Sequence, residues 1–340
     1  MWLSSQEIKE KYVSKGTYTI TKKAVDDNTT KMVKAGTPLI VSRSGILARL
    51  FPISIPTTDV AINQDIKALI FDPNIITTNF FVAQLQKNEE FILRSIVKTG
   101  TTVQSINMPD FYKLLLSFPS TDEQEKVGKF FQRLDDAVAL HLCKQKQLKL
   151  LKQSLIKEML PQNDSDLPRL RAANFSKPWE QHQLREVLNV NSGRDYKHLN
   201  KGNIPVFGTG GYMLSVDGTL SEVDGIGLGR KGTIDKPQYL RAPFWTVDTL
   251  FFLTPLPNFD LHFLYTLIQS INWKSMDEST GVPSLSKAVI EIVTRAFPSF
   301  EEQQKIGSIF KQLDDTIILH EQKIDDLKTL KSTLLNKMFI

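Results

Sequence analysis

The side chains that could carry chemistry in this chain do not form a catalytic pattern. The glycines at 227, 229 and 232 match G-x-G-x-x-G, but Thr233-Ile-Asp-Lys-Pro237 follows them, and a nucleotide-binding fingerprint needs a helix there. No P-loop or amino-methylase motif occurs, and Pro109-Asp110 lacks the downstream Asp/Glu-x-Lys of a nuclease site. The histidines have no metal-ligand spacing; they are His141, His182, His198, His262 and His320. We therefore expect no catalytic residue and no metal site in this chain.

Basic side chains do recur beside glycine, serine and threonine in short loops. Arginine can fork onto guanine edges, lysine neutralises phosphate, and glycine lets backbone N–H groups approach phosphate oxygens. A solvated turn is the alternative for each loop alone, but the loops recur at matching places in both halves of the chain. The candidate DNA contacts are Ser42, Arg43, Ser44, Arg194, Lys197, Lys201, Thr209, Gly210, Tyr212, Arg230 and Lys231.

The bulk composition limits the class of protein. The 340 residues are enough for two domains with cores of their own. With 42 basic and 37 acidic side chains the net charge is +5, which excludes a histone-like polycation and leaves local basic loops. The single cysteine, Cys143, excludes a disulfide framework. No apolar run approaches a membrane span and no secretory signal opens the chain, so we expect a cytoplasmic protein without a membrane partner.

Larger elements must position these loops. The clearest of them is a segment that occurs twice in the sequence. FPSTDEQEKVGKFFQRLDDAVALH begins at Phe118, and FPSFEEQQKIGSIFKQLDDTIILH begins 179 residues later at Phe297. The copies align without a gap over residues 118–159 and 297–338. Ser120 with Glu123, and Ser299 with Glu302, have capping-box spacing, so each copy predicts a helix start.

Each copy continues as a heptad seam, which is typical of a coiled coil. Two helices with matching seams favour an antiparallel pair related by a pseudo-twofold axis; the alternative is that each helix packs on its own domain. The predicted inter-helix contacts are Val127, Phe131, Leu134, Val138, Leu148 and Leu155 in the first copy, and Ile306, Phe310, Leu313, Ile317, Leu327 and Leu334 in the second.

Polar residues on the predicted helices have structural interpretations. His141 and His320 fall at equivalent seam positions without a carboxylate cluster, so we expect packed or hydrogen-bonded histidines. The pairs Asp135-Asp136 and Asp314-Asp315 cannot converge as catalytic dyads, because neighbours on a helix point about 100° apart. A solvated face or a polar contact to a partner is expected there.

The regions before the two helices share an order of strand, basic turn, strand, short helix and Thr-Gly loop. The sequence therefore predicts an α+β fold of two mixed α/β domains, each followed by a long helix. We expect a first domain over residues 1–119, a first helix over 120–160, a linker over 161–178, a second domain over 179–297 and a second helix over 298–340.

These features resemble one family, the specificity subunits of type I restriction–modification systems. The resemblance rests on the doubled F-P-S-x-x-E-Q-x-K-[IV]-G-x-x-F-x-x-L-D-D, on Trp179-Glu180-Gln181 with Leu184-x-Glu186-Val187, and on Ile204-Pro-Val-Phe-Gly-Thr-Gly-Gly211. It covers essentially the whole chain. One departure is that the first domain lacks a counterpart of residues 179–203, which we interpret as a first domain shortened at its N-terminus.

The resemblance implies that two target-recognition domains each read half of a bipartite, asymmetric site in double-stranded DNA, while the helix pair fixes the gap. It implies no catalysis by this chain. Two modification (methyltransferase) subunits would dock on the helices and restriction subunits would join them. S-adenosylmethionine, ATP and Mg²⁺ would be used by those partners. Two alternatives stay open: a truncated regulatory or decoy specificity subunit, and a coiled-coil adaptor without specific DNA binding.

Overall fold

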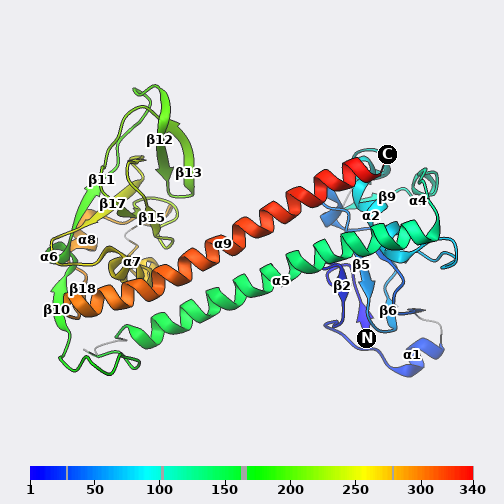
Figure 1. The fold of residues 1–340 in the computed structure, drawn as a ribbon, viewed down its shortest axis with the longest axis horizontal. Coiled ribbons are helices and arrows are strands. Elements are labelled where there is room, and N and C mark those ends of the chain that lie inside the picture. Colours follow the sequence, from blue (N-terminus) through cyan, green and yellow to red (C-terminus); the bar gives the residue numbers. More distant parts are fainter. Residues whose placement is uncertain (28–29, 101–102, 162–166, 278, 340) are drawn as a thin grey trace. The chain divides into compact units, whose positions relative to one another are not determined.

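The computed structural model describes residues 1–27, 30–100, 103–161, 167–277 and 279–339. It divides into two compact units: unit 1 comprises Met1–Cys143 and His320–Ile340, and unit 2 comprises Lys144–Leu319. Two long helices, α5 (Thr121–Met159) and α9 (Phe300–Met338), cross the division. Each unit therefore contains one α/β domain and one segment of each long helix (Figure 1).

The domain of unit 1 is built from short strands in three small sheets. Their orders are β1-β6-β3, β2-β5-β4-β7 and β8-β9. The strands are β1 (Trp2–Leu3), β2 (Tyr12–Val13), β3 (Lys31–Val33), β4 (Leu39–Val41), β5 (Ile53–Pro56), β6 (Val60–Ile62), β7 (Ile66–Ala68), β8 (Val97–Thr99) and β9 (Gln104–Ile106). The helices are α1 (Lys22–Asp26), η1 (Gly45–Ala48), α2 (Thr78–Lys87), α3 (Glu89–Phe91), η2 (Ile92–Ile96) and α4 (Met108–Phe111).

The domain of unit 2 has the larger core. Its sheets have the orders β10-β18, β11-β17-β14-β15 and β13-β12-β16. The strands are β10 (Glu180–Gln183), β11 (Leu188–Ser192), β12 (Lys201–Gly208), β13 (Gly211–Val216), β14 (Gly225–Gly229), β15 (Gln238–Leu240), β16 (Trp245–Thr246), β17 (Leu250–Pro255) and β18 (Thr294–Phe297). The helices are α6 (Leu184–Val187), α7 (Leu261–Ser270), η3 (Trp273–Met276) and α8 (Lys287–Glu291).

The glutamine of the repeated Glu-Gln dipeptide in each long helix binds the N-terminus of a shorter helix in its own unit. The shorter helix is α2 in unit 1 and α7 in unit 2. In unit 1, Gln124 Oε1 accepts from the backbone N of Thr77 at 3.0 Å, and its Nε2 donates to the carbonyl of Ile75 at 2.9 Å. In unit 2, the equivalent Gln303 accepts from the backbone N of Asp260 at 3.1 Å. Thr77 and Asp260 are the N-cap residues of α2 and α7. The glutamine thus satisfies a helix-end donor that has no partner within its own helix.

The repeated glycine permits the close contact that follows. A Cβ on Gly128 would lie 2.8 Å from the backbone N of Phe80 in α2. On Gly307, the equivalent residue, a Cβ would lie 2.9 Å from the backbone N of Phe263 in α7 and 2.2 Å from Asp260 Oδ1. The motif E-Q-x-K-x-G therefore encodes how a long helix packs on its domain.

Within each unit the two long-helix segments also pack on each other, and they run antiparallel. In unit 1, Phe131 clusters with Leu335 and Phe339, and further along the helices His141 Nδ1 lies 2.8 Å from His320 Nδ1. In unit 2, Ile306 and Phe310 share the core with Leu155 and Met159. The predicted α+β class with a pair of antiparallel long helices is confirmed. The two packing modes considered for the helices coexist, because Phe131 also contacts the cluster formed by Phe80 of α2.

The aspartates at the repeated Leu-Asp-Asp differ from the expectation of a solvated face. Asp135 pairs with Lys331 and, at 2.7 Å, with Lys11, and the equivalent Asp314 pairs with Lys152 at 2.6 Å. The two lysines of the long helices, like the two aspartates, are 179 residues apart. A charged donor stabilises a half-buried carboxylate, so these ion pairs hold the helix segments together within each unit.

One capping box is also different from its prediction. The backbone N of Glu123 donates to Ser120 Oγ at 3.4 Å, which is half of the expected motif. Glu302, however, is buried and receives two hydrogen bonds from Arg171, at 2.7 and 2.8 Å. The guanidinium satisfies both carboxylate oxygens, so this side chain anchors the segment before the second domain rather than capping α9.

The predicted seam residues have reduced exposure along both helices. Those buried are Phe131, Ile306, Phe310 and Ile317, and those half-buried are Val127, Leu134, Val138, Leu148, Leu155, Leu313, Leu327 and Leu334. Among the described residues, no helix has the length and hydropathy that a bilayer crossing requires. The predicted linker, 161–178, lies partly outside the described residues.

Candidate nucleic-acid interface

The predicted basic turn of unit 2, Arg230-Lys231-Gly232, leaves the end of β14 and is held on two sides. The backbone N of Arg230 donates to the carbonyl of Thr249 at 2.8 Å, and the backbone N of Gly232 donates to the carbonyl of Pro283 at 2.8 Å. Gly232 has φ +87, which favours glycine. The guanidinium of Arg230 lies 5.9 Å from the ring centroid of Phe251. Both basic side chains are exposed, so the turn presents two cations on a fixed backbone.

This turn opens onto a small cleft of about 330 Å³ whose other walls were not predicted. The cleft adds hydroxyl groups and one further cation, and none of the described residues that line it is acidic. Lys287 opens α8 and pairs with Glu291 at 3.5 Å, outside the cleft lining. The side chains missed by the sequence reasoning are Ser192, Ser284, Ser286 and Lys287. The recurring Thr-Gly loop was the available signal for three of them, because it leads directly into Ser284, Ser286 and Lys287.

A single carboxylate shapes the loop that forms one wall of this cleft. Asp277 accepts from the backbone N of Ser279 at 3.0 Å, from its hydroxyl at 2.9 Å and from the backbone N of Ser284 at 2.9 Å. These donors, the Ser284 backbone first, lower the pKa of the Asp277 carboxyl. The ionised carboxylate therefore holds Ser284 beside Lys231, with which Ser284 forms a β-bridge.

The turn of the β12–β13 hairpin lies against the basic turn. A Cβ on Gly232 would be 3.9 Å from Thr209 Oγ1, and Gln238 Nε2 donates to the carbonyls of Gly208 and Thr209 at 2.9 and 3.2 Å. Gly210 is exposed, and the following Gly211 has φ +109. The structure therefore brings Thr209 and Gly210 together with Arg230 and Lys231.

Three predicted contacts lie on a second surface of the same hairpin. Lys197, Lys201 and Tyr212 line a cleft of about 720 Å³ along β12 and β13. All three are exposed, and Tyr212 offers an aromatic face of the kind that stacks on bases. Arg194 is also exposed, and its backbone N donates to the carbonyl of Thr246 at 2.8 Å. Arg194 is not among the described residues that line either cleft.

The basic turn of unit 1 repeats the arrangement found in unit 2. Arg43 is exposed and forms a β-bridge with Ser105, as Lys231 does with Ser284, and the two serines are 179 residues apart. Ser42 is buried and its hydroxyl donates to the carbonyl of Asp65 at 3.0 Å. Ser44 accepts from the backbone N of Ile46 and caps η1. These two serines hold the turn, so only Arg43 of the predicted group presents its side chain outward.

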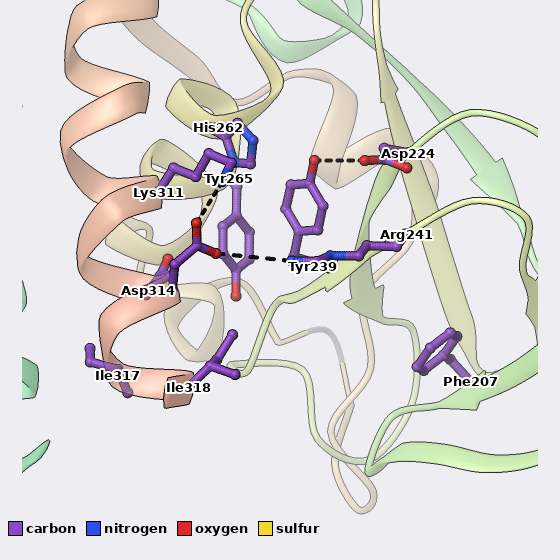
Figure 2. Close-up of a pocket in the computed structure, with 11 residues that line it drawn as sticks. Phe207, Asp224, Tyr239, Arg241, His262, Tyr265, Lys311, Asp314, Ile317 and Ile318 are labelled. Carbon is purple, nitrogen blue, oxygen red and sulfur yellow. Dashed lines mark hydrogen bonds and ion pairs between the residues drawn. The ribbon is translucent and has the colours of Figure 1, made fainter. Parts of the chain in front are cut away.

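A larger cleft of about 730 Å³ lies between the β-sheets of unit 2 and α9, and it has a different character (Figure 2). Tyr239 stacks on His262 with ring centroids 4.9 Å apart and donates to Asp224 at 2.9 Å. Burial lowers the pKa of His262. The charged lining consists of two cations and three carboxylates, namely Arg241, Lys311, Asp224, Asp314 and Asp315. This acidic excess makes it unsuitable for a phosphate backbone.

The histidines that the sequence analysis considered as metal ligands have other contacts in the structure. Among the described residues, no three His, Cys, Asp or Glu side chains gather where they could hold a metal ion. His141 and His320 bond each other, as expected, and His198 packs its ring on Trp245. His182 lies 3.4 Å from Glu186 in the segment that opens the second domain.

Comparison with known proteins accounts for the doubled architecture. The family described as "Type I restriction modification DNA specificity domain" matches residues 3–150 and again residues 176–329. The chain belongs to this family. Both matches combine one domain with most of one long helix, which is the repeat found in the sequence.

Individual proteins similar to this chain are also type I specificity subunits. The chain is 28% identical over 134 residues to the EcoR124I/EcoR124II specificity subunit of Escherichia coli, a match that covers 39% of this chain and 33% of that subunit. It is 24% identical over 287 residues to a putative type I specificity subunit of Mycoplasma genitalium, covering 79% of this chain and 73% of the relative. The crystal structure of a type I restriction–modification S subunit from M. genitalium aligns with a TM-score of 0.72 at 18% identity, over 99% of this chain and 91% of that one. That likeness concerns the fold.

Proposed function

We propose that this specificity-domain protein reads a bipartite site in double-stranded DNA, with unit 1 and unit 2 each contacting one half-site. The observation that carries the proposal is the matched basic turn of the two units. Arg43 in one and Arg230-Lys231 in the other are exposed, and each turn forms a β-bridge with an equivalent serine. Exposed cations on rigid backbone are suited to reading base edges, while the neighbouring hydroxyls and lysines suit phosphate contacts.

The long helices provide a second, different surface, which we assign to partner subunits. Several large apolar side chains remain exposed away from the seam, and they recur at equivalent positions of the two copies. Leu140 and Leu319, for example, are 59% and 57% exposed. The other equivalent pairs are Phe130 with Ile309 and Leu151 with Leu330. Repeated exposed apolar positions are typical of a docking surface, and two copies suit two modification (methyltransferase) subunits.

The chemistry of modification and cleavage is then assigned to the partners. Restriction subunits would join the complex by binding the modification subunits. S-adenosylmethionine, ATP and Mg²⁺ would be used by these partner subunits. This chain would contribute sequence recognition and assembly without a catalytic role of its own.

A salt titration of DNA binding tests the proposal. The wild type and an Arg230→Gln/Lys231→Gln variant, each with its modification subunits, are titrated with duplex DNA carrying the methylated site of the host genome. Loss of phosphate or base contacts should weaken binding and lower the slope of log K against log[salt] by about 1 for each phosphate contact removed. Lys305→Gln, which removes one cation from α9, is the control for a change of surface charge and should bind as the wild type does.

Three results would contradict the assignment. Equal affinity of the wild type for the site and for unrelated DNA would favour the adaptor without specific recognition. Unchanged binding by the Arg230→Gln/Lys231→Gln variant would remove the basic turn from the interface. Binding of modification subunits without DNA recognition would favour the regulatory or decoy form.

A further inference from the structure

The cleft of about 730 Å³ beside α9 has no part in the proposed DNA interface, and we call it the aromatic cleft. Phe207 of β12, Tyr239 of β15 and Tyr265 of α7 line it with aromatic rings, and Ile317 and Ile318 line it from α9 (Figure 2). All of its lining residues belong to unit 2. A cleft of this size with an aromatic and aliphatic lining can enclose a side chain of another molecule.

The rings of this lining are held in place by one another. Tyr239 and His262 stack nearly parallel, with an interplanar angle of 5° and ring centroids 4.9 Å apart. Tyr265 meets Tyr239 edge-on, with centroids 5.6 Å apart. Lys152 of α5 places its Nζ 5.4 Å from the centroid of the Tyr265 ring. The aromatic wall is therefore formed before any ligand binds, and one of its rings already interacts with a cation.

The charges in the aromatic cleft are unevenly paired. Both lining cations serve Asp315, which lies 2.5 Å from Lys311 and 3.9 Å from Arg241. Asp314 is paired with Lys152 at 2.6 Å. Asp224, the third carboxylate of the lining, forms no ion pair among the described contacts.

Asp224 is bound instead by two neutral donors. The hydroxyl of Tyr239 donates to one of its oxygens at 2.9 Å, and the backbone N of Ala242 donates to the other at 2.8 Å. Burial, and after it the hydrogen bond to Asp224, raises the pKa of Tyr239, so the hydroxyl remains a donor at neutral pH. Each carboxylate oxygen can accept a further hydrogen bond. A half-buried carboxylate in this state favours a cationic ligand.

The aromatic lining is particular to unit 2. By their distance from the residue that contacts the packing glycine, His262 and Tyr265 of α7 correspond to Asn79 and Val82 of α2. Asn79 donates to Gln132 of α5 at 2.9 Å, a bond between two neutral amides. Because the corresponding side chains of unit 1 are not aromatic, we expect a ligand of the aromatic cleft to bind once per chain.

The aromatic cleft adjoins the surface that we assign to the modification subunits. Ile318 lines the cleft and is 44% exposed. The next residue, Leu319, is one of the exposed apolar side chains that recur on the two long helices. A subunit that covers Leu319 can therefore reach the cleft from the same side of α9.

We propose that the aromatic cleft binds an arginine side chain of the modification subunit that docks on unit 2. The inference rests on the proposed docking of these subunits on the long helices. A planar guanidinium stacks on aromatic rings and forms two parallel hydrogen bonds with one carboxylate, here that of Asp224. The ammonium of lysine is more strongly hydrated and lacks this planar match.

Titration of modification subunits into the intact chain, followed by sedimentation velocity, tests the proposal. The wild type should bind two subunits. Asp224→Asn should bind one of them as the wild type does and the other about tenfold more weakly or worse, since a buried arginine is a frequent anchor of an interface. Glu222→Gln removes an exposed carboxylate outside the cleft lining and is the control.

A second variant guards against misfolding of Asp224→Asn, which keeps only one acceptor for two donors. Ile318→Lys places a cation at the rim of the cleft from an exposed position of α9 and should weaken the same single subunit about tenfold or more. Thr316→Lys adds the same charge at an exposed position of α9 outside the lining and should have no effect.

A small probe tests the cleft without a partner. Nα-acetyl-arginine amide should shift the NMR signals of the His262 ring in the intact chain, and the citrulline analogue, its neutral counterpart, should not. The shift should be lost in Asp224→Asn. Equal shifts from both compounds, or none from either, would overturn the assignment of a guanidinium.

Two outcomes of the subunit titration would also overturn the proposal. In one, both variants bind two subunits as tightly as the wild type does. In the other, both subunits are weakened equally, which would indicate a general structural effect. A wild type that binds no modification subunit would instead contradict the proposed docking on the long helices, and this inference with it.

Discussion

At the scale of single residues, the proposed DNA interface depends as much on the groups that hold the basic turns as on the cations themselves. Asp277 receives three hydrogen bonds from Ser279 and Ser284 and so fixes the wall beside Lys231. Ser42 and Ser44 have the corresponding supporting role for Arg43. These polar side chains order the loops from which the cations project.

Replacing Asp277 should therefore weaken DNA binding without unfolding unit 2. Asp277→Ala removes all three acceptor contacts, and we expect binding several-fold weaker while unit 2 stays folded at the assay temperature. Hydrogen exchange should show the Ser284 amide losing protection. Asp235→Ala, which removes a half-buried carboxylate paired with Lys274, is the control and should keep DNA affinity.

The same carboxylate predicts a pH dependence. The pKa of Asp277 is lowered in the folded state, so its stabilisation of the loop is complete above the unfolded value of about 4 and is lost as pH falls through the folded value. The Ser284 amide signal in an NMR titration should shift below about pH 4 in the wild type. An unshifted signal, or the same shift in Asp277→Ala, would contradict this role.

Residue-level prediction from sequence was limited by tertiary context. Arg230 and Lys231 were identifiable because a basic turn beside glycine is a local pattern. Ser192 could not be, since it joins the cleft from β11, far along the chain from β14. Ser42 matched the same local pattern as Arg43 but is buried, where its hydroxyl donates to the carbonyl of Asp65, a residue that the local pattern does not include.

At the scale of elements, the glycine of each long helix determines how closely a domain helix can approach. Gly307→Ala would place a Cβ 2.9 Å from the backbone N of Phe263, and backbone cannot move aside as a side-chain tip can. We expect unit 2 to lose about 1–3 kcal/mol of stability, measured by chemical denaturation. Ser308→Ala, at the adjacent exposed position, should cost less than about 0.5 kcal/mol. Equal effects of the two changes would show that the close contact is not needed.

The paired charges between the long-helix segments should contribute unequally in the two units. Asp135 serves both Lys331 and Lys11, whereas Asp314 serves Lys152 among the described contacts. Burial lowers the pKa of Lys331 even beside this carboxylate, so its charge is costly to leave unpaired. We expect Asp135→Asn to destabilise unit 1 by about 2–4 kcal/mol and Asp314→Asn to destabilise unit 2 by about 1–2 kcal/mol. Denaturation that shows the opposite order would contradict this account of the repeated Leu-Asp-Asp.

The two long helices could be predicted from their long heptad pattern, whereas the contacts that single polar residues on them make could not. The doubled heptads indicated both long helices, since a seam over many turns has no other interpretation. The role of Gln124 and Gln303 was not predicted, because a helix surface alone does not show which N-cap lies against it. Lys152 and Lys331 interrupt the apolar seam, and only the structure shows their aspartate partners.

At the scale of the whole molecule, the unit boundaries fall within both long helices, between residues 143 and 144 and between 319 and 320. If the helices set the spacing of the half-sites, as the family resemblance implies, inserting seven residues at both places should lengthen the spacer by about 3 base pairs, since each residue adds about 1.5 Å of helix. Insertion into one helix alone should break the register of the pair and abolish specific binding. An unchanged spacer after the double insertion would exclude this function of the helices.

The family and its doubled architecture could be inferred from sequence because the repeat and its motifs are local patterns in the chain. The pairing of β10 with β18 and of β11 with β17 could not be inferred in the same way, because the paired strands lie far apart in the chain.

The most direct test of the central claim is selection of binding sites from a random duplex library, with modification subunits present. The wild type should enrich two half-site motifs at a fixed spacing. Arg230→Gln/Lys231→Gln should lose one motif and keep the other, and Arg43→Gln should lose the opposite one. Enrichment of no motif, or loss of the same motif in both variants, would contradict the assignment of one half-site to each unit.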